Sequence, residues 1–216
     1  MSGRLAKPLL AAFVLAAVAE LVSVAVDART GQLLAKPLLM PLLAAYVAAR
    51  GGPRLLVAAL LLGWGGDVFL LFPADGAFLA GMGCFAAGHV CYLALFGRRR
   101  TRVSLGVGYA LALVVTLALL WSGLPAELRV PVAVYSLLLA AMAYLASALG
   151  ALAGAGGALF LLSDTLIALG VAGRPEPPAA DLWIMITYLA AQALLTAGIL
   201  TGRPRTQART PAPAHD

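Results

Sequence analysis

Residues 54–72 read RLLVAALLLGWGGDVFLLF, and this stretch decides the fold because it is almost wholly apolar yet carries an acidic residue. It is about as long as the roughly 20 apolar residues that a helix needs to cross a bilayer. A charge at the centre of such a helix costs at least about 2.5–3.5 kcal/mol, so it normally faces a partner or a cavity. The stretch therefore predicts a transmembrane helix with Asp67 directed into a protein interior.

The rest of the chain repeats this pattern. Of its 216 residues, 62% are hydrophobic and 11% are charged, and its mean hydropathy is +0.97. Soluble domains are nearer half apolar and a quarter charged, so the composition excludes that class. The apolar blocks between glycine and proline breaks predict an all-α, polytopic transmembrane helix bundle, a single domain over 1–202 with a disordered cytoplasmic tail over 203–216. The predicted spans are 7–26, 33–49, 54–72, 77–96, 103–122, 130–149, 153–172 and 182–201.

The formal net charge of +6 comes from residues that lie between the apolar blocks. This placement excludes a nucleic-acid partner, which needs a basic face, and is typical of charges that orient a membrane protein. Eight spans put both termini on one side, and that side carries 11 of the 15 Lys and Arg residues. We therefore expect a multi-pass protein of the plasma or inner membrane with cytoplasmic termini. The 11 are Arg4, Lys7, Arg50, Arg54, Arg98, Arg99, Arg100, Arg102, Arg203, Arg205 and Arg209; the other four are Arg29, Lys36, Arg129 and Arg174.

A second acidic residue, Asp164, lies inside the predicted span 153–172 at a depth similar to that of Asp67. Two facing carboxylates in a low dielectric cannot both ionise easily, so we expect the pair to share a proton. Such a pair supplies an acid and a base together and is the candidate catalytic centre. The alternative is that each aspartate forms a hydrogen bond that fixes helix packing.

The two aspartates also raise the hypothesis of an internal duplication. They lie in the third and the seventh predicted span, and the residues around them are similar. Four spans in each half would make the halves parallel repeats, a 4+4 arrangement. Chance similarity between two apolar helices is the alternative.

Several other polar or aromatic residues are candidates for binding a substrate near the aspartates. His89, with Tyr92 one turn on, is either a proton relay or a core histidine bonded to a carbonyl. Lys36 is either an anchor at the membrane interface or a ligand for a phosphate. Glu20 is either a structural partner for another helix or part of the site. The full set of candidate substrate-binding residues is Lys36, Trp64, His89, Tyr135, Ser163, Tyr188 and Gln192.

We expect neither a metal nor another cofactor. A catalytic zinc site is typically built from about three protein ligands in which histidine is prominent. The chain has two histidines, His89 and His215, and the second lies in the predicted tail.

Short motifs along most of the chain resemble those of the YhhN family. In the first half these are KPLLMP at 36–41, Gly66-Asp67, FLAGM at 78–82 and GHVCY at 88–92. The second half continues with Tyr135, Met142, GALFLLSD at 157–164 and YLAAQ at 188–192. Their order and spacing make the combination more specific than any one of them.

The resemblance implies an eight-span lysoplasmalogenase, which hydrolyses the vinyl ether bond of a lysoplasmalogen. The products would be a fatty aldehyde and glycerophosphoethanolamine or glycerophosphocholine, with Asp67 and Asp164 as the matched acidic positions. A lipid substrate is thus the expected partner. From the residues alone, a small proton-coupled transporter or lipid-binding membrane protein is the alternative, and a purely structural membrane protein would leave the acidic pair unexplained.

Overall fold

The computed structural model describes residues 3–73, 76–98 and 101–202, and every regular element in these ranges is a helix. This confirms the predicted all-α bundle. The helices are α1 (Gly3–Ala25), α2 (Arg29–Ala49), α3 (Arg54–Phe69), α4 (Ala77–Phe96), α5 (Val103–Leu120), α6 (Ala126–Ala146), the short 3₁₀ helix η1 (Ser147–Leu149), α7 (Ala151–Val171) and α8 (Ala180–Thr201).

Each predicted span corresponds to one α-helix, but α3 is shorter than the sequence indicates. Seven helices of the described chain are long and apolar enough to cross a membrane, whereas α3 has 16 residues and ends at Phe69. Pro73 disfavours helical backbone at the residue before it, which explains why 70–72 form turns instead. Arg29 donates a hydrogen bond to the carbonyl of Leu71 and so satisfies a polar group beyond the end of α3.

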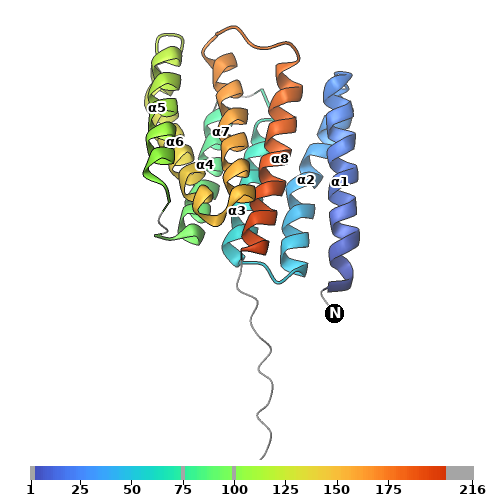
Figure 1. Ribbon diagram of the computed structural model, residues 1–216. Coiled ribbons are helices and arrows are strands. Elements are labelled where there is room, and N and C mark those ends of the chain that lie inside the picture. The colour runs from blue at the N-terminus through green and yellow to red at the C-terminus, as the bar shows by residue number, and fades with distance from the viewer. Residues whose placement is uncertain (1–2, 74–75, 99–100, 203–216) are drawn as a thin grey trace, which may run out of the picture.

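The helices alternate in direction, and α1 begins at the same end of the bundle at which α8 ends (Figure 1). The most extensive contacts join α7 with α8, α3 with α4, and α1 with α2. α5 lies at one side of the bundle and contacts chiefly α6. α3 and α7, which carry the two aspartates, therefore run in the same direction.

Close approaches at glycine bring the helices of the candidate site together. A Cβ added at Gly157 would lie 2.7 Å from Cα of Ala143, so α7 rests directly on α6. A Cβ added at Gly198 would lie 2.6 Å from the backbone nitrogen of Ala153, so α8 rests directly on α7. Small residues at such crossings are typical of helices packed in a membrane. They hold α6, α7 and α8 at backbone contact.

The outer face of the bundle is apolar, and a small set of polar side chains is buried within its largely apolar core. Large side chains such as Leu15, Val107 and Leu111 are exposed on its outer face, whereas a set of polar side chains is buried. A protein whose surroundings are hydrocarbon shows this distribution, because polar groups there need protein partners. The buried polar residues are Glu20, Asp67, His89, Ser163, Thr187, Gln192 and Thr196.

The expected disordered tail, 203–216, lies outside the described residues. The hypothesis of an internal duplication stays a prediction. Five of the arginines that were counted for orientation also lie outside: Arg99, Arg100, Arg203, Arg205 and Arg209.

Candidate active site

Asp67 ends a chain of hydrogen bonds that crosses three helices. The side chain is 5% exposed, and its Oδ2 accepts a hydrogen bond of 2.8 Å from the hydroxyl of Tyr188 on α8. The Tyr188 oxygen lies 3.5 Å from Nε2 of Gln192, whose Oε1 accepts a hydrogen bond of 2.8 Å from Tyr92 on α4. The side-chain amide of Gln192 thus orients the hydroxyl groups of both tyrosines by hydrogen bonds, and the Tyr188 hydroxyl donates to the carboxylate of Asp67.

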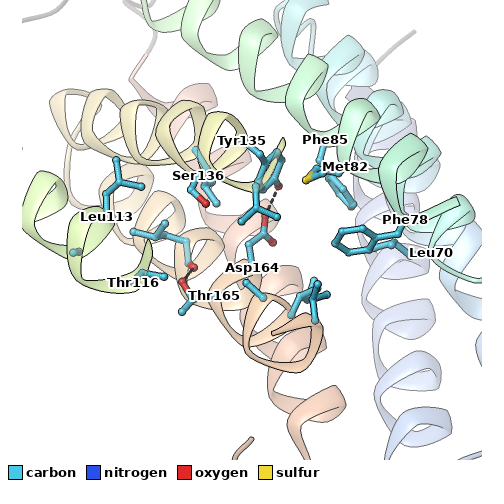
Figure 2. A pocket seen from close by; sticks show the side chains of 17 residues that line it. Leu70, Phe78, Met82, Phe85, Leu113, Thr116, Tyr135, Ser136, Asp164 and Thr165 are labelled. Atoms are coloured by element: carbon cyan, nitrogen blue, oxygen red, sulfur yellow. Dashed lines mark hydrogen bonds between the residues drawn. The ribbon is translucent and has the colours of Figure 1, made fainter. Parts of the chain in front are cut away.

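Asp164 ends a second, separate chain of hydrogen bonds. Its Oδ2 accepts a hydrogen bond from the hydroxyl of Tyr135 on α6 (Figure 2). The Tyr135 oxygen lies 3.1 Å from Nε2 of His89 on α4. Nδ1 of this buried histidine has no hydrogen-bond partner. Because a neutral imidazole carries one donor and one acceptor, the chain Asp164–Tyr135–His89 can pass a proton in either direction.

Aromatic rings connect the two chains of hydrogen bonds. Phe160 stands edge-on to His89 at 4.8 Å between centroids and to Tyr188 at 5.5 Å. Phe85 packs edge-on against both Phe160 and Tyr188, at 6.3 Å and 6.0 Å. Among the described residues no hydrogen bond joins the two carboxylates. Each aspartate instead accepts a hydrogen bond from a tyrosine, and the shared proton stays a prediction.

A buried ion pair lies on the Asp67 side of this aromatic group. Nζ of Lys36 on α2 is 3.9 Å from Oε1 of Glu20 on α1. Glu20 is fully buried, and neither of its carboxylate oxygens has a hydrogen-bond partner. Both charges interact electrostatically with Asp67. The Lys36 side chain, which is 18% exposed, thus extends toward buried acidic residues.

Two predicted site residues are placed elsewhere. The hydroxyl of Ser163 donates to the backbone carbonyl of Ile184 at 3.1 Å, so it joins α7 to α8. Trp64 is 38% exposed, on the outer face of α3, although it lies only three residues before the buried Asp67. Neither side chain belongs to the two hydrogen-bonded chains.

A mostly apolar pocket opens at Asp164. It has a cavity volume of about 70 Å³ and is formed by α4, α5, α6 and α7 with the end of α3. Figure 2 shows Asp164 and Tyr135 directed toward each other in its wall, with Phe78 and Met82 on one side and Leu113 on the other. Asp67 does not line this pocket. The pocket therefore suits a hydrocarbon chain with its reactive end at Asp164.

Residues that the sequence did not assign to the site also contribute. Phe85, His89 and Tyr92 follow one another on α4 at intervals of four and three residues, which places them on one helical face. That spacing is the signal that identifies Phe85 and Tyr92. Phe160 lies one turn before Asp164 on α7, but a single ring among leucines and alanines carries no comparable signal. No group of three or more His, Cys, Asp or Glu in the described ranges could hold a metal ion.

The fold and these buried groups define a multi-pass helical membrane protein with two aspartates in its interior. The sequence profile of the YhhN family matches residues 31–199, and the chain belongs to this family. It is 38% identical to lysoplasmalogenase TMEM86B of Homo sapiens over 77% of this chain and 69% of that protein. It is 37% identical to lysoplasmalogenase TMEM86B of Sus scrofa, over 74% and 70% of the two chains.

A bacterial relative carries the same name. Lysoplasmalogenase of Mycobacterium tuberculosis is 34% identical over 69% of this chain and 62% of its own length. No solved structure matches the chain significantly. The predicted family and the predicted class, an enzyme similar to the lysoplasmalogenases, are confirmed.

Proposed function

We propose that this protein hydrolyses the vinyl ether bond of a lysoplasmalogen, with Asp67 and Asp164 as its catalytic residues. The products would be a fatty aldehyde and glycerophosphoethanolamine or glycerophosphocholine. The observation that carries the proposal is a carboxylate, Asp164, in the wall of an apolar pocket, with a second buried carboxylate across a shared aromatic group. The names of the relatives support the same chemistry.

The reaction needs one carboxylic acid and one carboxylate. The acid gives its proton to the outer carbon of the vinyl group, which leaves an oxocarbenium ion at the carbon bonded to oxygen. Water adds at that carbon and gives a proton to the carboxylate. The product of this addition is a hemiacetal. The hemiacetal then loses its hydroxyl proton as the bond to the glycerol oxygen breaks, and that oxygen takes up a proton. Glycosidases divide similar work between two carboxyl groups.

The other polar side chains hold these groups in place. Tyr135 and Tyr188 each donate a hydrogen bond to one aspartate, and His89 and Gln192 orient the two tyrosines. Preorganised donors of this kind stabilise developing charge without reorganisation during the reaction. The apolar pocket takes the hydrocarbon chain of the lipid.

The membrane placement is part of the proposal. Residues 1–202 form one transmembrane domain in the plasma or inner membrane, with both termini in the cytoplasm. The positive charges of the loops support this orientation.

The test compares two substrates with matched variants. Purified protein in lipid nanodiscs is incubated with a 1-alkenyl and with a 1-acyl lysophospholipid, and aldehyde and fatty acid are measured. We expect aldehyde from the first and no fatty acid from the second. Asp67→Asn and Asp164→Asn should each lower the rate by about 10²–10⁴-fold, the usual contribution of an acid or base.

Asp181→Asn is the matched control, because Asp181 is an exposed residue in the first turn of α8. It should leave the rate within about twofold of that of the wild-type protein, as expected for surface substitutions. Aldehyde release that survives either of the other substitutions would remove that aspartate from the mechanism. Proton-coupled lipid uptake without hydrolysis would favour a transporter.

A further inference from the structure

Glu20 is the least satisfied polar group in the interior of the described chain. It is 0% exposed, and both of its carboxylate oxygens lack a hydrogen-bond partner. Its one ion pair is with Lys36, at 3.9 Å. An unpaired buried charge is strongly destabilising, so Lys36 is what makes Glu20 tolerable in the bundle. In return, Glu20 restricts where the ammonium group can lie.

The same ammonium group distinguishes the two catalytic aspartates. Lys36 interacts electrostatically with Asp67. Asp164 accepts a hydrogen bond from Tyr135 and interacts electrostatically with Asp67, and no Lys or Arg is among the residues that line its pocket. One aspartate thus has a positive neighbour, whereas the other faces an apolar pocket.

We infer that Lys36, which its ion pair with Glu20 accommodates in the bundle, is a positioning residue beside Asp67 and so divides the roles of the two aspartates. Asp67 is the carboxylate that takes the proton from water, because a neighbouring cation stabilises the ionised form. Asp164 is the acid that protonates the vinyl carbon, because an apolar pocket favours the neutral form. The inference rests on the proposed hydrolysis and adds Glu20 and Lys36 to its machinery.

The surroundings of Asp67 determine how its ionisation responds to substitutions. Lys36 on α2, Glu20 on α1, Tyr188 on α8 and Asp164 on α7 all interact with it. α4 packs closely against α3, and its titratable side chains are Cys84, His89, Cys91 and Tyr92. Lys36 is the one cation in this group. Removing it and removing Glu20 should therefore act on Asp67 in opposite directions.

The first test is the pH profile of kcat for Glu20→Gln and for Glu20→Gln combined with Lys36→Met. The acidic limb of that profile reports the base in the enzyme–substrate complex. In Glu20→Gln, Lys36 keeps only Asp67 as a partner, so the limb should move to lower pH by about one unit. In the double variant the cation is lost, so the limb should move to higher pH than in the wild-type protein, again by about one unit. The alkaline limb, which Asp164 sets, is the internal reference.

The double variant avoids leaving Glu20 buried without a counter-charge, as Lys36→Met alone would. Thermal unfolding of each variant shows whether it is folded. The inference would be overturned if the acidic limbs of both variants coincided with that of the wild-type protein, or if both moved in the same direction. A purely structural ion pair changes stability and not the ionisation of Asp67.

A second measurement needs no turnover. The infrared band of the protonated carboxyl group of Asp67 is identified by its loss in Asp67→Asn, and it is titrated in each variant. The band should disappear at lower pH in Glu20→Gln and at higher pH in the double variant than in the wild-type protein. Unshifted titration overturns the inference even if aldehyde is released. Shifted titration without aldehyde release supports the arrangement of charges and counts against the proposed hydrolysis.

Discussion

Tyr135 is the residue through which Asp164 reaches the rest of the bundle. Its hydroxyl donates to the aspartate and lies 3.1 Å from Nε2 of His89. In Tyr135→Phe the carboxyl group keeps its place but loses its donor and its path to the histidine. Hydrogen bonds to charged groups contribute about 1.5–3 kcal/mol, so we expect kcat to fall by about 10–100-fold with KM little changed. Steady-state aldehyde release measures both constants.

The matched control is Tyr144→Phe on the same helix. Tyr144 packs edge-on against Tyr109 of α5, at 6.5 Å between centroids, and belongs to neither hydrogen-bonded chain. Tyr144→Phe keeps the packed ring and removes only a hydroxyl outside both chains of hydrogen bonds, so it should leave kcat within about twofold. Equal losses in both variants would mean that α6 responds to any change of its tyrosines, and Tyr135 would then have no special role.

At this scale the sequence reveals the charged residues better than their partners. Asp67 and Asp164 are conspicuous because each carries a charge within an apolar helix. Tyr135, Tyr188, Gln192 and His89 were predicted near them, but which tyrosine serves which aspartate depends on helix rotation. The pairing of Lys36 with Glu20 depends on how α1 lies against α2. A single sequence specifies neither the rotation of the helices nor the packing of α1 against α2.

Among the α-helices, α5 has the fewest buried residues of its own. Within its span only Leu120 is buried, and the helix contacts chiefly α6. It nevertheless forms one wall of the pocket, through Ala112, Leu113 and Thr116. A helix that borders the pocket and otherwise faces lipid can accept a larger side chain without disturbing the core.

Ala112→Phe should therefore shorten the preferred hydrocarbon chain. The ring would occupy part of the pocket, and contacts of one methylene are worth about 1–3 kcal/mol in such sites. We expect the ratio of kcat/KM for long-chain over short-chain lysoplasmalogen to fall by about tenfold or more. Ala118→Phe makes the same change at an exposed position of α5 outside the pocket, and its ratio should equal that of the wild-type protein. An unchanged ratio in Ala112→Phe would mean that the hydrocarbon chain of the substrate binds outside this pocket.

The number and order of helices follow from the apolar blocks and their breaks, whereas the length of α3 does not. Hydropathy continues through Leu70, Leu71 and Phe72, so the sequence indicates helix up to Phe72. The chain turns earlier because Pro73 restricts the backbone before it and because Arg29 binds the carbonyl of Leu71. The second cause is a contact between helices and is invisible in the local sequence.

On the scale of the whole molecule, the alternating helices place both described ends of the chain at one end of the bundle (Figure 1). The connection between α5 and α6 lies at the opposite end. The excess of positive charge on the side of the termini supports the proposal that this side is cytoplasmic. The aspartates and their pocket then lie within the bilayer, where a lipid can reach them.

Cysteine labelling tests this orientation directly. In a background with Cys84→Ala and Cys91→Ala, which removes the free thiols of the described chain, Thr201→Cys marks the end of α8 and Ala126→Cys marks the start of α6. Both positions are exposed. A membrane-impermeant maleimide added to intact cells should modify the thiol at 126 and leave the thiol at 201 unmodified. Permeabilised cells provide the control, because both thiols should then react. The reverse pattern in intact cells would invert the bundle in the membrane, while modification of both thiols would contradict the assignment of these two ends to opposite sides.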